Sequence, residues 1–90
     1  TKAPTLKITT YKGDPKITWN SVSGAKLYWV FVSTDGKTYY FLNETKNTSY
    51  IDKNVKAGKK YYYKVQAVAL YNGTFAIPSA YSYPVSITAK

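Results

Sequence analysis

The chain has 90 residues, a length typical of one domain with a single core. Hydrophobic residues make up 44% of it and aromatic residues 18%, which excludes a disordered linker. Cysteine is absent, so neither a disulfide framework nor a thiolate metal site is available. No run of about 18 apolar residues occurs, and no charged start is followed by an apolar segment, so we predict neither membrane insertion nor a signal peptide.

The charge is strongly positive, because thirteen lysines and no arginine stand against four acidic residues, for a net charge of +9. Such a charge favours contact with anionic polymers. Only Lys53, Lys56, Lys59 and Lys60 form a local group, whereas the other lysines are scattered singly. Specific nucleic-acid recognition would use arginine forks. We therefore predict a solvated lysine surface and no specific nucleic-acid partner.

Turn-forming residues punctuate the chain at short intervals, and the segments between them alternate with period 2. No window has the 3.6-residue period of an amphipathic helix. The pattern indicates an all-β sandwich. Seven strands are predicted in chain order, at Thr5 to Thr9, Lys16 to Ser21, Lys26 to Ser33, Thr38 to Leu42, Ser49 to Ile51, Tyr61 to Leu70 and Tyr81 to Thr88.

Alternation along these strands assigns the side chains that face the core. The predicted inward residues are Leu6, Ile8, Ile17, Trp19, Tyr28, Val30, Val32, Val85 and Ile87. The third strand is apolar on both faces, which places Leu27, Trp29 and Phe31 on its outer face. The long strand lies beside it and presents Tyr62, Lys64, Gln66 and Val68 on the same side.

The register of the fourth strand depends on the turn before it. Asp35-Gly36 suits a type I′ hairpin turn. A two-residue turn would place Tyr40 and Leu42 beside Phe31 on the outer face, whereas a three-residue bulged loop would place Tyr39 and Phe41 there. The sequence leaves both registers open.

Val55 to Ala67 reads as a tight turn followed by a long alternating strand that opens with Tyr61. It resembles the tyrosine corner of a fibronectin type III domain. Ile17-Thr18-Trp19 looks like the second strand of that family, Gly24 to Val30 like the start of its third, and Thr48 to Asp52 like its fifth. The resemblance covers the chain from Pro4 to Thr88.

This resemblance implies a seven-stranded antiparallel Ig-like sandwich that occupies residues 1–90 as one module. It implies structural roles for Trp19, in the core, and for Tyr61, whose hydroxyl should bond to backbone near Val55 to Gly58. We expect the module to be excised from a larger chain, of the kind found in extracellular proteins of Gram-positive bacteria. The loop 71–75 contains no Arg-Gly-Asp, so integrin recognition by that route is not expected.

Catalytic groups are scarce, since histidine and cysteine are both absent. The four acids are Asp14, Asp35, Glu44 and Asp52, and three of them lie in turn contexts where a carboxylate usually bonds to nearby backbone. Nothing brings two acids together across a cleft or gathers the six to eight oxygens of a calcium site. We predict no enzyme activity, no metal and no cofactor.

The outward aromatic residues Trp29, Phe31 and Tyr62 are the candidate binding face. Three interpretations stand: the rings pair across strands and shield each other, they contact a neighbouring module, or they stack sugar rings. The predicted function is a monomeric accessory module that spaces and orients adjacent domains of a secreted or cell-surface protein. The alternative is a module that binds polysaccharide, cell-wall polymer or protein through this face.

Overall fold

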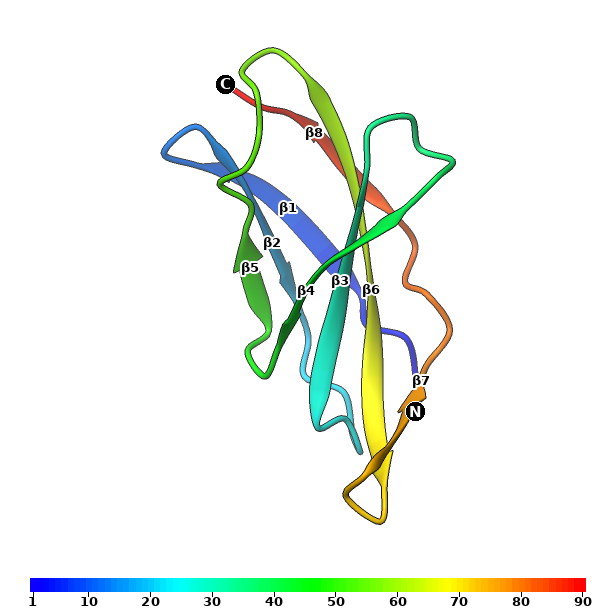
Figure 1. Cartoon of the computed structure of the whole chain (residues 1–90). Helices are drawn as coiled ribbons and strands as arrows, with labels where there is room; N and C mark the ends of the chain where they lie inside the picture. Colours follow the sequence, from blue (N-terminus) through cyan, green and yellow to red (C-terminus); the bar gives the residue numbers. More distant parts are fainter.

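The computed structural model describes all 90 residues, which form eight antiparallel strands in two facing sheets (Figure 1). The strands are β1 (Leu6–Tyr11), β2 (Asp14–Trp19), β3 (Leu27–Ser33), β4 (Tyr40–Thr45), β5 (Ser49–Ile51), β6 (Lys60–Tyr71), β7 (Phe75–Pro78) and β8 (Val85–Thr88). The small sheet has the order β1-β2-β5. In the large sheet, β3 pairs with β4 on one side and with β6 on the other, and β7 and β8 both pair with β6. No helix is long and apolar enough to cross a membrane.

The predicted sandwich is confirmed, and the strands lie close to their predicted positions. The last predicted strand, Tyr81 to Thr88, is wrong in its first half, because residues 79–84 form an irregular link and β8 begins only at Val85. The strand β7 before this link was not predicted, so the sandwich has eight strands where seven were expected. In this link the hydroxyls of Ser79 and Ser82 accept hydrogen bonds from the N–H groups of Ala67 (3.0 Å) and Val65 (2.9 Å). Side chains thus replace part of the backbone ladder, and the link stays fixed to β6 without being a strand.

The core lies between the sheets and consists of the buried residues Ile17, Trp19, Val22, Tyr28, Val30, Tyr61, Tyr63, Val65, Ala67 and Ala89. The rings of Trp19 and Tyr28 meet edge to face, with centroids 5.6 Å apart. Leu6, Ile8, Val32 and Val85 are partly buried against this cluster, and Ile87 is half-buried. The inward residues that alternation predicts in β1, β2, β3 and β8 are therefore observed.

Two buried tyrosines fix loops to the core through their hydroxyl groups. The hydroxyl of Tyr61 accepts a hydrogen bond from the Lys56 N–H at 2.8 Å, within the segment where the sequence places it. The hydroxyl of Tyr28 accepts one from the Val22 N–H at 3.0 Å. Each bond satisfies a backbone donor that the loop itself leaves unpaired, so the phenol both fills the core and anchors the chain.

The β1–β2 hairpin turns through Lys12 and Gly13, since Tyr11 pairs directly with Asp14. Both turn residues have positive φ, 50° for Lys12 and 88° for Gly13, as a type I′ turn requires. The left-handed region favours glycine and asparagine over other residues, so lysine is strained there. The β6–β7 turn also has two residues with positive φ, Asn72 (53°) and Gly73 (69°), and both are of the types that this region favours.

Replacing Lys12→Asn should stabilise the protein by about 0.5 to 1 kcal/mol, because asparagine adopts the left-handed conformation at lower cost. Urea unfolding followed by tryptophan fluorescence measures the change. The matched control is Asn72→Lys, which should destabilise the protein by a similar amount. A Lys12→Asn variant no more stable than the parent would contradict this assignment of strain.

Candidate functional site

The outer face of the large sheet carries a cluster of aromatic side chains centred on Phe31. Phe31 lies opposite Lys64 of β6 and Phe41 of β4. Its ring packs edge to face against Phe41, at 5.8 Å and 80°, and against Tyr81, at 5.2 Å and 81°. These distances and angles are those that aromatic quadrupoles favour. Phe31 therefore supports one ring from β4 and one from the link between β7 and β8.

Lys64 completes this cluster from β6. Its ammonium lies 3.7 Å from the centroid of the Tyr81 ring and 4.1 Å from that of the Tyr39 ring. Both distances are well within the range of a cation–π interaction. We call Phe31, Tyr39, Phe41, Lys64 and Tyr81 the aromatic cluster. Phe41 is 57% exposed and Tyr81 is 48% exposed, whereas Phe31 beneath them is half-buried.

The observed register between β3 and β4 places Phe41 beside Phe31 through a bulge between Val30 and Phe31. Of the two registers left open, the one with Phe41 beside Phe31 is correct, although the three-residue loop expected with it is not observed. The type I′ turn at Asp35-Gly36 is wrong, because only Gly36 has positive φ and the connection runs over residues 34–39. A longer loop forms because the Ser33 hydroxyl accepts the Gly36 N–H at 2.9 Å, which redirects the chain.

The loop 34–39 is organised around the Asp35 carboxylate. It accepts hydrogen bonds from the N–H groups of Thr38 (2.9 Å) and Lys37 (2.8 Å) and from the Ser33 hydroxyl (2.8 Å). These bonds, the Thr38 and Lys37 N–H groups first, lower the pKa of Asp35 to about 2 because they stabilise the charged form. The carboxylate thus has a structural role as the anchor of this loop.

The three residues of the predicted binding face lie on one face, but they do not form an open patch. Trp29 is half-buried, and its indole N–H donates to Glu44 Oε1 at 2.9 Å. Tyr62 is also half-buried and lies against Gly36, where the φ of 77° favours glycine and a Cβ would lie 3.3 Å from the ring. Phe31 lies under the exposed rings. The accessible surface is therefore supplied by Phe41 and Tyr81.

Two of the predicted outward residues of β6 are buried. Val68 has no exposed surface, and its carbonyl accepts the Lys26 N–H at 2.8 Å. Gln66 is buried as well, and its amide nitrogen donates to the Ser79 carbonyl at 2.8 Å. The link after β7 covers this part of the face, which alternation alone does not reveal. Alternation correctly predicts Lys64 on this face. It assigns Tyr81 to the last strand, so it does not predict that the Tyr81 ring belongs to this face.

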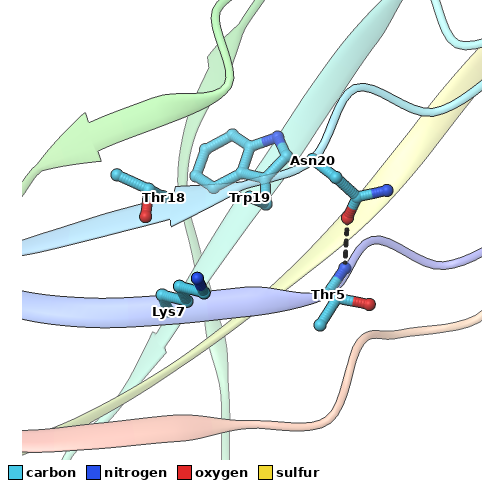
Figure 2. A pocket seen from close by; sticks show the side chains of 5 residues that line it. All are labelled: Thr5, Lys7, Thr18, Trp19 and Asn20. Carbon is cyan, nitrogen blue, oxygen red and sulfur yellow. Dashed lines mark hydrogen bonds between the residues drawn. The ribbon is translucent and has the colours of Figure 1, made fainter.

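A hollow of about 540 Å³ lies over β1 and β2, and Figure 2 shows the side chains that line it: Thr5, Lys7, Thr18, Trp19 and Asn20. The Thr5 N–H donates to the Asn20 amide oxygen at 2.7 Å, so these two groups satisfy each other. Lys7 is the one ionisable side chain in the lining, and no acid faces it there. This arrangement has no acid–base pair.

Asp52 is the one acid in the interior, with 3% of its surface exposed. Its Oδ2 accepts the Tyr63 hydroxyl at 2.7 Å, and its Oδ1 accepts the Asn54 N–H at 3.1 Å. Burial, and then the bond to Asp52, raise the pKa of Tyr63 well above its usual value of 10. Both carboxylate oxygens are therefore occupied in holding the loop after β5. No group of three His, Cys, Asp or Glu residues gathers where it could hold a metal ion.

No protein-family model and no curated protein matches this chain. Among solved structures, it is similar to part of a β-1,2-glucanase from Parabacteroides distasonis, with 33% identity and a TM-score of 0.84, over 98% of this chain and 12% of the glucanase. It is similar to an Fn3-like protein from Clostridium thermocellum, with 32% identity and a TM-score of 0.79, over 93% of this chain and 88% of that one.

A pectate lyase from Erwinia chrysanthemi, PelI, solved in complex with tetragalacturonic acid, shares the fold. The identity is 17% and the TM-score 0.77, over 93% of this chain and 28% of the lyase. Two facing antiparallel sheets, with a tyrosine at the start of the long strand that accepts a hydrogen bond from the preceding loop, define an Ig-like β-sandwich. Given its similarity to nearly the whole Fn3-like protein, the chain belongs to the fibronectin type III family.

Replacing Tyr63→Phe should cost about 1 to 3 kcal/mol at pH 7, because Asp52 Oδ2 would lose its donor while remaining buried. Since folding raises the pKa of Tyr63, its contribution is fully present below pH 10 and is lost as the pH rises further. The difference in stability between parent and variant should therefore shrink above pH 10. Urea titrations at pH 7 and pH 11 measure it, and equal stabilities at pH 7 would contradict the structural role.

Proposed function

We propose that this chain is a non-catalytic accessory module that spaces and orients the neighbouring domains of a secreted or cell-surface protein. The observation that carries this proposal is the position of the termini at opposite ends of an elongated sandwich (Figure 1). The longest dimension of the molecule is 43 Å. A chain that enters at one end and leaves at the other holds its two neighbours apart and in a fixed relative orientation.

Contacts near both termini support this geometry. The Lys90 N–H donates to the Gly13 carbonyl at 3.2 Å, beside the β1–β2 turn. At the other end of β2, the Thr5 N–H donates to the Asn20 amide oxygen at 2.7 Å. The chain is thus bonded to the body of the sandwich from Thr5 at one end to Lys90 at the other, so the direction of a neighbouring domain would be transmitted through the module.

The comparisons support an accessory role within a longer chain. The similar segment makes up 12% of the β-1,2-glucanase, at 33% identity, and 28% of the pectate lyase. In both, a domain like this one accompanies a much larger enzyme chain. Adjacent domains are accordingly the proposed partners, and the module itself is proposed to be a monomer.

The proposal that the module is not catalytic rests on the hydrogen bonds that its carboxylates accept. The Asp35 carboxylate is occupied by hydrogen bonds within its own loop, and the Asp52 carboxylate by bonds from the Asn54 N–H and from the Tyr63 hydroxyl of β6. Glu44 accepts the indole N–H of Trp29. Each of these carboxylates therefore has a structural partner, and none faces a second acid across a hollow.

The spacing role is tested by fusing a donor and an acceptor fluorescent domain to Thr1 and Lys90 and measuring the distribution of transfer distances. We expect a narrow distribution centred beyond the 43 Å length of the module. The control replaces the module with a Gly/Ser linker of equal length, which behaves as a flexible coil and gives a broad distribution. A distribution as broad as that of the linker would contradict the proposal.

A further inference from the structure

We propose that the outer face of the large sheet binds an acidic polysaccharide, whose sugar rings stack on Phe41 and Tyr81 and whose carboxylates pair with Lys60 and Lys64. This binding function goes beyond the spacing role and does not depend on it.

The two exposed rings are held rigidly although each has about half of its surface in solvent. Phe41 is supported by the ring of Phe31, and Tyr81 is supported by Phe31 on one side and by the Lys64 ammonium on another. The segment that carries Tyr81 is fixed to β6 by the Ser79 and Ser82 hydroxyls. A surface already ordered in this way loses little side-chain entropy when a ligand stacks on it.

The position of these rings leaves them accessible in a row of domains. The large sheet with β3, β4 and β6 forms one side of the sandwich, whereas the termini lie at its two ends (Figure 1). Neighbouring domains joined at the ends therefore do not need to cover this side. None of the hollows in the structure includes Phe41 or Tyr81. An open strip suits an extended polymer, while a small ligand would be enclosed in a concave pocket.

The charge of the face favours an anionic polymer. Lys60 and Lys64 project outward from β6 on either side of Tyr62, and the Lys60 ammonium lies 5.3 Å from the centroid of the Tyr62 ring. Lys64 is fixed between two rings, so its positive charge stands beside the stacking surface. The acids that border the face, Asp35 and Glu44, already accept hydrogen bonds from their own surroundings.

The whole chain strengthens this field, because its net charge is +9. A sugar acid combines the two features that the face offers: an apolar C–H face that complements an aromatic ring, and a carboxylate that pairs with an ammonium group. A neutral glycan would use only the rings, and the lysines beside them would have no ligand group to neutralise.

The experiment is isothermal titration of the 90-residue protein with polygalacturonate and with the same polymer after methyl esterification of its carboxylates. We expect saturable binding of the acidic polymer, weakened by increasing salt, and at least ten-fold weaker binding of the ester. Phe41→Ala should reduce affinity for the acidic polymer about ten-fold or more. Lys60→Gln, at an exposed position, should reduce affinity several-fold and flatten the salt dependence without affecting folding.

The matched control is Phe75→Ala, which removes a ring that is 65% exposed on β7, away from the aromatic cluster. It should bind like the parent protein. Equal loss of affinity in Phe41→Ala and Phe75→Ala would overturn the proposed site. Equal binding of acid and ester would overturn the assignment of an acidic ligand, and no binding of either polymer would overturn the proposal and leave the face to a protein partner. None of these results alters the distance distribution that tests the spacing role.

Discussion

Strand β6 runs without interruption through the large sheet. Its side chains point alternately into the core and onto the outer face, so the same strand builds both. Tyr61 and Tyr63 point into the core, where their hydroxyls bind the Lys56 N–H and the Asp52 carboxylate. Lys64 points outward into the aromatic cluster. A shift of one residue in the pairing of β6 would exchange these faces, burying an ammonium group and exposing the core tyrosines. The register of this one strand therefore determines both stability and site.

The outer face is held in place by the core, because the same strands form both. The side chains of Val65 and Ala67 are buried on the inner face, while their N–H groups donate hydrogen bonds to the two serine hydroxyls of the link that carries Tyr81. The exposed ring is thus attached to the most deeply buried part of the large sheet. This arrangement combines a spacer, which needs fixed ends and a stiff body, with a side surface that is ordered before any ligand arrives.

Local pattern was sufficient for the parts of the fold that follow alternation. It located the sandwich and the inward residues, including Trp19, and it placed Lys64 on the outer face. It was insufficient where side chains replace backbone pairing. The Ser33 hydroxyl lengthens the β3–β4 loop, and the serines of the β7–β8 link remove Tyr81 from a strand. The bonds of Ser79 and Ser82 join residues 12 and 17 positions apart, which local pattern does not predict, so Tyr81 could not be identified as an exposed ring. The Ser33 bond to Gly36 is local, but it competes with the turn that Asp35-Gly36 favours, so Phe41 remained one of two alternatives.

The most direct measurement is a solution NMR spectrum of the side chain of Lys64. Rings of Tyr39 and Tyr81 beside its ammonium should shift the terminal methylene protons of Lys64 upfield, and nuclear Overhauser contacts should join them to both rings. Phe31 should show contacts to the rings of Phe41 and Tyr81 in the same spectrum. Lys64 methylene shifts equal to those of an unstructured lysine, without ring contacts, would show that β6 does not build the aromatic cluster and would contradict the account.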